Sequence, residues 1–155
     1  MNLINFHIDI DLLHFKDQLI TKVDHNKVKL FDIIRKKYLT LQPEEIVRQL
    51  CILWLIEDQK FSRNNIQVEK TIDIHGLQRR FDIVVYDKSI FPYILVECKA
   101  PQVKITQSTF DQISAYQWVM RAPYLMVTNG SEHYIAKMDE KNKKYEFFSE
   151  VPCWH

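Results

Sequence analysis

Apolar runs bounded by turn residues predict most of the strands in this chain. Residues 81–86 and 93–99 are two such runs, and the polar residues between them predict a hairpin. Residues 67–74 precede them across a tight turn at Gly76, because glycine readily adopts the positive φ that such turns require. These three segments predict a three-stranded meander. The remaining predicted strands are residues 124–128, 133–138 and 145–148.

Apolar positions three and four residues apart predict two helices. The first covers residues 43 to about 58 and opens with a proline, which suits the first helical position. The second covers residues 109 to about 121, with Ser108 as its N-terminal cap. Because a strand after a crossover helix should lie parallel to the strand before it, residues 124–128 should lie parallel to residues 93–99. The pattern predicts an α/β fold with a mixed central sheet flanked by helices.

The N-terminal part of the chain has a less regular pattern. Residues 1–25 alternate apolar and polar positions in a way that suits a strand or a helix, and the pattern does not decide between them. Residues 27–38 have mixed periodicity and are interpreted as an extended lead-in, with the basic run at residues 35–37 exposed. We therefore divide the chain into an N-terminal extension, residues 1–26, and a single globular domain, residues 27–152.

Composition and charge narrow the classes of function. A chain of 155 residues, 46% hydrophobic and 26% charged, has the balance of one soluble globular domain. It lacks an apolar stretch of about 18 residues and a signal-peptide pattern, which predicts a cytoplasmic protein with no membrane contact. Three scattered cysteines indicate reduced thiols. The two glycines, Gly76 and Gly130, are too far apart to form the GxxxxGK(S/T) phosphate-binding loop of a motor ATPase. A net charge of +1 argues against a large DNA footprint.

Three charged residues stand out within the two central predicted strands. Because residues two apart share one face of a strand, Glu97 and Lys99 point the same way, whereas Cys98 points into the core. Asp82 joins them from the neighbouring strand. A half-buried carboxylate is costly unless a cation meets it, and two carboxylates beside one lysine suit Mg²⁺, which takes oxygen ligands and keeps several waters. Neutralisation of Glu97 by Lys99 alone is the simpler alternative.

These residues resemble the motif of a known nuclease superfamily. Asp82 followed by Glu97-Cys98-Lys99 resembles the D…(D/E)xK core of the PD-(D/E)XK nucleases, with Phe81 in place of the proline. The flanking segments resemble one branch, the N-terminal nuclease domain of type I restriction enzyme R subunits. The resemblance implies a restriction-endonuclease-like core. The flanking segments are residues 43–49, Ala100-Pro101, Gln112 with Tyr116, and Thr128-Asn129-Gly130.

The resemblance implies a metal site. Asp82 and Glu97, with the backbone carbonyl of Cys98, would hold Mg²⁺ or Mn²⁺, and Lys99 would orient the attacking water or neutralise charge on the phosphate. Many nucleases of this superfamily also carry a glutamate near the metal on the first core helix, and Glu45 is chosen here over its neighbour. From the residues alone, both glutamates of this first turn complement the positive end of the helix dipole.

Residues that would contact nucleic acid follow from the same resemblance. Gln112 and Tyr116 are four residues apart and share a helix face, where the resemblance gives them a role in positioning the catalytic lysine or touching the DNA backbone. Without the resemblance, a half-buried aromatic and a solvated glutamine explain them equally well. Arg48 and Arg80 complete the predicted nucleic-acid contacts.

The implied function is a divalent-metal-dependent DNA endonuclease of restriction or DNA-processing type. Enzymes of the superfamily hydrolyse a phosphodiester by in-line displacement and usually leave a 5′-phosphate and a 3′-hydroxyl. The expected partners are DNA and a motor or specificity subunit supplied in trans, and homodimerisation is left open. The alternative is a catalytically weak or inactive nucleic-acid-binding or interaction module of a restriction or repair complex. A purely structural domain ranks last.

Overall fold

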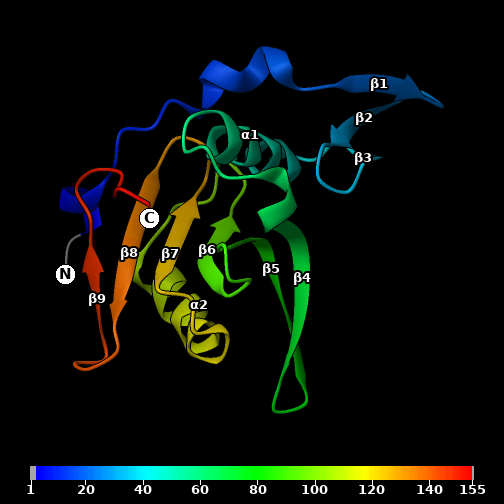
Figure 1. Ribbon diagram of the computed structural model, residues 1–155. Helices are drawn as coiled ribbons and strands as arrows, with labels where there is room; N and C mark the ends of the chain where they lie inside the picture. Colours follow the sequence, from blue (N-terminus) through cyan, green and yellow to red (C-terminus); the bar gives the residue numbers. More distant parts are fainter. Residues whose placement is uncertain (1–2, 155) are drawn as a thin grey trace.

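A six-stranded mixed sheet forms the centre of the molecule (Figure 1). The computed structural model describes residues 3–154. The strands lie in the order β4-β5-β6-β7-β8-β9, and neighbouring strands are antiparallel except β6 and β7, which are parallel. The predicted meander and the predicted parallel pair are both confirmed. The strands are β4 (Ile66–Ile74), β5 (Leu77–Tyr86), β6 (Pro92–Cys98), β7 (Tyr124–Thr128), β8 (His133–Asp139) and β9 (Lys144–Phe147).

The two α-helices serve two separate hydrophobic cores, one on each side of the sheet. The apolar stripe of α1 (Pro43–Glu57) packs with Ile94 and Val96 of β6, whereas α2 (Gln107–Met120) packs with Leu95 of the same strand. Because alternate residues of a strand point to opposite faces, β6 contributes side chains to both cores. The predicted α/β class, with a mixed sheet flanked by helices, is confirmed.

α2 begins two residues earlier than predicted. Thr106, not Ser108, is the N-terminal capping residue, and its backbone N–H donates to Thr109 Oγ1 at 3.2 Å. The helix ends at Met120, after which Arg121 adopts a left-handed conformation with φ of 53°. None of the helices within residues 3–154 is long and apolar enough to cross a membrane.

A second sheet of three antiparallel strands precedes α1. The prediction of an extended lead-in from residue 27 misses this sheet, and the division after residue 26 falls at the turn between its first two strands. The sheet projects from the body of the molecule, next to α1 (Figure 1). It consists of β1 (Thr21–Asp24), β2 (Lys27–Asp32) and β3 (Lys37–Thr40), and follows two short 3₁₀ helices, Leu3–Phe6 and Leu12–Gln18.

The hairpin of β4 and β5 extends past the rest of the sheet (Figure 1). His75 and Gly76 form its two-residue turn with φ values of 51° and 81°, the left-handed conformations that a type I′ turn requires. The expectation of a positive φ at Gly76 is therefore confirmed. The first four residues of β5 are exposed, whereas the next five are buried in the sheet, so the hairpin tip is free to form the wall of a cleft.

Candidate active site

Asp82 lies at the junction of β5, β6 and α1. Its Oδ2 accepts a hydrogen bond from the backbone N–H of Cys98 at 2.6 Å, which ties β5 to the end of β6. Its Oδ1 accepts a hydrogen bond from Arg48 Nη2 at 3.1 Å. The side chain is only 9% exposed. Because each carboxylate oxygen has two acceptor positions, both oxygens retain capacity for one further partner.

Glu97 and Lys99 lie on the face of β6 opposite to Cys98. Lys99 Nζ donates to Glu97 Oε1 at 3.1 Å, and the backbone N–H of Lys99 bonds to the carbonyl of Thr128 at 2.8 Å, which extends the pairing with β7. Cys98 is fully buried in the α1 core, as the alternation predicts. The pleat of the strand thus separates the two charged side chains from the thiol between them.

A pocket of about 510 Å³ opens beside Glu97 and Lys99. The exposed end of β5 forms one wall and α2 forms another, with Gln112 and Tyr116 among the lining residues. The guanidinium carbon of Arg79 lies 4.7 Å from the centre of the Tyr116 ring, a cation–π contact that joins the two walls. The structure therefore brings the predicted pair on α2 to the same pocket as the predicted lysine.

Glu97 lines this pocket and is repelled by two nearby carboxylates, Asp82 and Glu44. Burial and the charge of Asp82 raise the pKa of Glu97 to about 7, although Lys99 opposes the shift. Burial and then Asp82 also raise the pKa of Glu44. Burial would lower the pKa of Lys99, but Glu97, Asp82 and Glu44 outweigh it and raise the pKa. Lys99 and Arg48 supply two positive charges against these three acids, and Arg48 also pairs with two further glutamates. The site therefore favours an additional cation.

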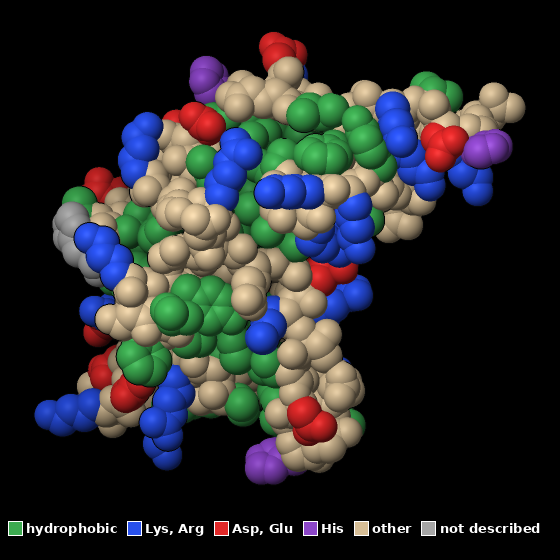
Figure 2. Space-filling model, turned by 45° about the vertical axis from the view of Figure 1, so that its right-hand side comes forward, with side chains coloured by type: hydrophobic (Ala, Val, Ile, Leu, Met, Phe, Trp, Pro, Cys, Tyr) green, Lys and Arg blue, Asp and Glu red, His purple; other side chains and the backbone are tan. Residues whose placement is uncertain are grey.

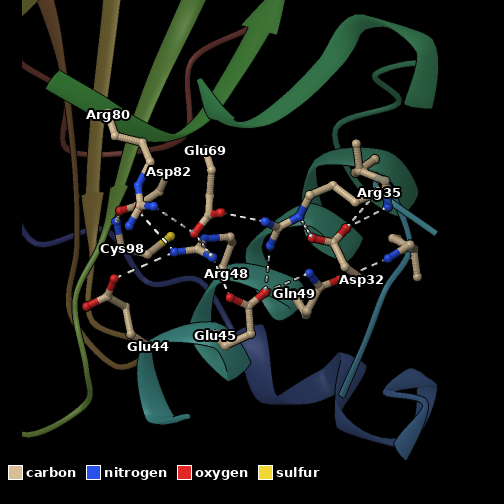
Figure 3. Close-up of polar contacts among 12 residues, drawn as sticks. Asp32, Arg35, Glu44, Glu45, Arg48, Gln49, Glu69, Arg80, Asp82 and Cys98 are labelled. Carbon is tan, nitrogen blue, oxygen red and sulfur yellow. Dashed lines mark hydrogen bonds and ion pairs between the residues drawn. The ribbon is translucent and has the colours of Figure 1, made fainter. Parts of the chain in front are cut away.

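Arg48 is the centre of a buried ion-pair network on the α1 side of Asp82 (Figure 3). It contacts Glu45 and Asp82 directly, and its Nη1 lies 3.3 Å from Glu69 Oε1. Burial would lower the pKa of Arg48, but these carboxylates outweigh it and raise the pKa. The side chain is 4% exposed. This burial does not present Arg48 to a phosphate, whereas Arg80, also predicted to bind nucleic acid, is 60% exposed and lines the pocket.

The two glutamates in the first turn of α1 point in different directions. Glu45 is buried against Arg48 and accepts a hydrogen bond from Gln49 Nε2 at 3.2 Å. Glu44 is half exposed, and its Oε1 lies 3.6 Å from Arg48 Nη2. Its charge also interacts with Asp82 and Lys99. The placement therefore favours Glu44 over Glu45 as the glutamate that approaches a metal, while the predicted role of Glu45 stays a prediction.

Two residues of the network, Glu69 and Arg35, are not among the predicted site residues. Glu69 interrupts β4 with a φ of 52°, a conformation that residues with side chains rarely adopt, and such strain is concentrated at functional sites. Arg35 was expected to be exposed but is 19% exposed, because its Nη1 lies 2.5 Å from Glu69 Oε2 and its Nε 2.6 Å from Asp32 Oδ2. Burial would raise the pKa of Glu69, but Arg35, Arg48 and Arg80 lower it.

Glu97 should make the protein less stable as the pH rises. Because burial raises its pKa from 4.5 to about 7, the folded state binds this proton more tightly than the unfolded state. The stabilisation is fully present below pH 4.5 and is lost as the pH rises through about 7. Glu97→Gln removes the titration, so the melting temperature measured in EDTA across this pH range should fall less in the variant than in the wild type.

Glu146→Gln provides the control for this comparison, because Glu146 is an exposed acid on β9. Its melting temperature should follow the wild-type pH profile. A Glu97→Gln profile that is parallel to the wild-type profile would contradict the assignment of the raised pKa to Glu97.

Comparison with known proteins relates the chain to type I restriction enzymes. The family model for the type I restriction enzyme R protein N terminus matches residues 43–152, from the start of α1 onward. A solved fragment, described as an HsdR subunit of a type I restriction enzyme from Vibrio vulnificus YJ016, has a similar fold, with a TM-score of 0.51 and 19% sequence identity. The similarity covers 72% of this chain but only 24% of that one, so this chain corresponds to about a quarter of that fragment. No curated protein matches the chain.

Proposed function

Because the chain belongs to the family of type I restriction enzyme R protein N termini, we propose that it is a nuclease domain of the PD-(D/E)XK type that hydrolyses DNA. The observation that carries the proposal is the convergence of Asp82 on β5 with Glu97 and Lys99 at the end of β6, where Glu97 and Lys99 line an open pocket. The family is restriction-related, and DNA is the polymer on which restriction acts. Our proposal goes beyond the family assignment in one respect, namely that this domain itself hydrolyses the DNA.

The donor set suits Mg²⁺ or Mn²⁺. Asp82, Glu97 and the backbone carbonyl of Cys98 would hold the ion, with Glu44 as an additional carboxylate close by. Within residues 3–154, no group of three or more His, Cys, Asp or Glu side chains is arranged to hold a metal. Mg²⁺ nevertheless needs only one or two protein carboxylates, because waters complete its coordination. The raised pKa values of Glu97 and Glu44 support the fit, since a cation would relieve their repulsion.

The protein residues divide the chemistry between them. A divalent cation supplies charge for the phosphoryl oxygen and lowers the pKa of a bound water. Lys99 orients the attacking water or balances the charge that develops on the phosphate. The attacking water gives up a proton to solvent, and its oxygen forms a bond to phosphorus as the bond to the 3′ oxygen breaks. The leaving oxygen takes a proton from solvent, so the products are a 5′-phosphate and a 3′-hydroxyl.

The pocket walls position the DNA strand. Gln112 is exposed on α2, and its amide NH₂ group donates hydrogen bonds to phosphate oxygens of the DNA backbone. Arg80 places a permanent positive charge at the opposite wall, where its exposed guanidinium binds phosphate. Tyr116 lies beneath Arg79 and keeps that wall in place. These contacts read no base sequence, so any specificity comes from a specificity subunit in trans.

The decisive experiment is the cleavage of supercoiled plasmid by the purified protein. With Mg²⁺ or Mn²⁺, the supercoiled form should convert to the nicked form, and EDTA should prevent the conversion. Isothermal titration should also detect Mn²⁺ binding that Asp82→Asn weakens by about tenfold or more, as expected when a charged ligand is removed. Intact plasmid in both metals, combined with no Mn²⁺ binding, would refute the nuclease proposal.

A binding module remains the second candidate because of one observation at Asp82. Both oxygens of this carboxylate already have partners, Arg48 and the backbone N–H of Cys98. If Arg48 holds Asp82 permanently, its positive charge disfavours a metal at the same carboxylate, and the domain binds DNA without cleaving it. Metal-independent DNA binding without nicking would identify this outcome.

A further inference from the structure

The three-stranded sheet carries an excess of positive charge. Residues 21–40 contain six Lys and Arg and two Asp, a net charge of +4, whereas the whole chain has a net charge of +1. The rest of the chain is therefore net negative. Lys and Arg side chains gather over this projecting part of the molecule in Figure 2. A near-neutral protein thus concentrates its positive charge on one structural element.

The register of the sheet places three of these lysines on one face. Lys22 of β1 lies directly opposite Lys29 of β2, and Lys27 is two residues from Lys29. Leu30 of β2 points to the opposite face and is fully buried. Because side chains alternate along a strand, Lys22, Lys27 and Lys29 share the face that points away from the core. We call this surface the β1–β2 lysine face.

Tyr38 on β3 borders the β1–β2 lysine face. Lys22 Nζ lies 4.1 Å from the centre of the Tyr38 ring, and Lys29 Nζ donates to Thr40 Oγ1 at 3.2 Å. Tyr38 is 38% exposed. These weak contacts leave the ammonium groups hydrated and free to exchange partners. Asp24 is the carboxylate of β1 on the same face, and its Oδ1 lies 2.7 Å from His25 Nδ1.

The turn after β2 connects this sheet to the candidate active site. Asp32 at the end of β2 is fully buried and accepts hydrogen bonds from the backbone N–H groups of Ile34 and Arg35. Arg35 then bonds to Glu69 on β4, which in turn contacts Arg48. The lysine face is therefore held in a fixed position relative to Asp82 by consecutive ion pairs, although its sheet lies outside the matched family region.

We propose that the β1–β2 lysine face binds the phosphate backbone of duplex DNA, away from the bond that is cleaved. The proposal rests on the proposed function for the identity of the polymer. Lysine ammonium groups act as hydrated point charges, and such contacts fix the position of a duplex without reading its sequence. The three ammonium groups, with one carboxylate among them, complement a polyanion. The ion pairs of Arg35 hold the lysine face, and with it the bound duplex, in a fixed position relative to the pocket.

The test compares two triple variants of the full chain for binding to a labelled DNA duplex in EDTA. Lys22→Gln/Lys27→Gln/Lys29→Gln removes the lysine face. Lys141→Gln/Lys143→Gln/Lys144→Gln removes the same charge from exposed positions in the turn before β9 and at its first residue. Fluorescence anisotropy at several salt concentrations gives the affinity and its salt dependence. Each lost phosphate contact should reduce the slope of log K against log salt by about 0.9, so the first variant should lose up to roughly 3.

The affinity of the first variant should fall by roughly a hundredfold at about 0.1 M salt, while the second variant stays close to the wild type. The conservative variant Lys22→Arg/Lys27→Arg/Lys29→Arg should retain binding, which excludes misfolding as the cause. Equal losses in the two glutamine variants, or a wild-type slope in the first, would refute the lysine face as the binding surface.

Nicking assays separate this result from the proposed function. If the protein nicks plasmid but the first lysine-to-glutamine variant keeps the wild-type salt slope, the lysine face is not the DNA-binding surface and the nuclease proposal stands. If the slope changes but no nicking occurs, the domain binds DNA through this face without cleaving it.

Discussion

Replacing Lys99 with alanine should slow the metal-dependent nicking of supercoiled plasmid by about 10²- to 10³-fold, the usual cost of removing one group that stabilises transition-state charge. Lys99 is the cation that lines the pocket beside Glu97. Its ammonium is 3.1 Å from the Glu97 carboxylate, where phosphate charge would develop during hydrolysis. The measurement is the initial rate of nicking in Mg²⁺ for the variant and the wild type.

Lys99→Ala should fold and should still bind metal. The side chain is 30% exposed, and within residues 3–154 its one hydrogen-bond partner is Glu97. A pair of this kind contributes little to stability. Loss of the positive charge makes the site more negative, so Mn²⁺ should bind the variant at least as tightly as the wild type. Lys104→Ala is the matched control, because Lys104 is exposed in the loop before α2. A Lys99→Ala protein that nicks at the Lys104→Ala rate would exclude Lys99 from the chemistry.

Strand periodicity explains why the centre of the site could be predicted from the sequence. Because side chains alternate along a strand, Glu97 and Lys99 must share one face. Because the connection between β5 and β6 is short, Asp82 must lie next to them. Both arrangements depend on residues that are close together in the sequence. The helical repeat likewise placed Gln112 and Tyr116 together, and the structure brings both to the pocket.

The ion-pair network could not be predicted because its partners are far apart in the chain. Arg35 and Glu69 are separated by 34 positions, and their contact depends on how the three-stranded sheet docks beside β4. The left-handed backbone at Glu69 is also unexpected, since a glutamate within an apolar strand pattern gives no signal for it. Only the complete fold brings the two residues together.

The missed three-stranded sheet did leave a signal in the sequence. His25 and Asn26 form the two-residue turn between β1 and β2, with φ values of 48° and 61°. Asparagine is one of the residues that tolerate this conformation, and two such residues between short alternating segments indicate a hairpin. The mixed periodicity of residues 27–38 hid it, because β2 is buried on one face only at its end.

Replacing Arg48 with methionine should lower the free energy of unfolding by about 3–5 kcal/mol, the usual cost of removing one partner from a buried ion pair. Methionine keeps much of the side-chain length but leaves Glu45 and Asp82 without their shared cation. Urea denaturation followed by tryptophan fluorescence measures the change. Arg80→Met is the control, because Arg80 is 60% exposed and lies 3.7 Å from Glu69, so its loss should cost less than about 1 kcal/mol.

The same variant tests whether Arg48 and a metal compete for Asp82. Loss of Arg48 frees Asp82 Oδ1, which should strengthen Mn²⁺ binding. A ligand that binds only the folded state stabilises it more as its dissociation constant falls at a fixed ligand concentration. Mn²⁺ should therefore raise the melting temperature of Arg48→Met more than that of the wild type. Equal increments in the two proteins would mean that the cation binds elsewhere. A larger increment in Arg48→Met would show that the arginine occupies the carboxylate until a metal replaces it.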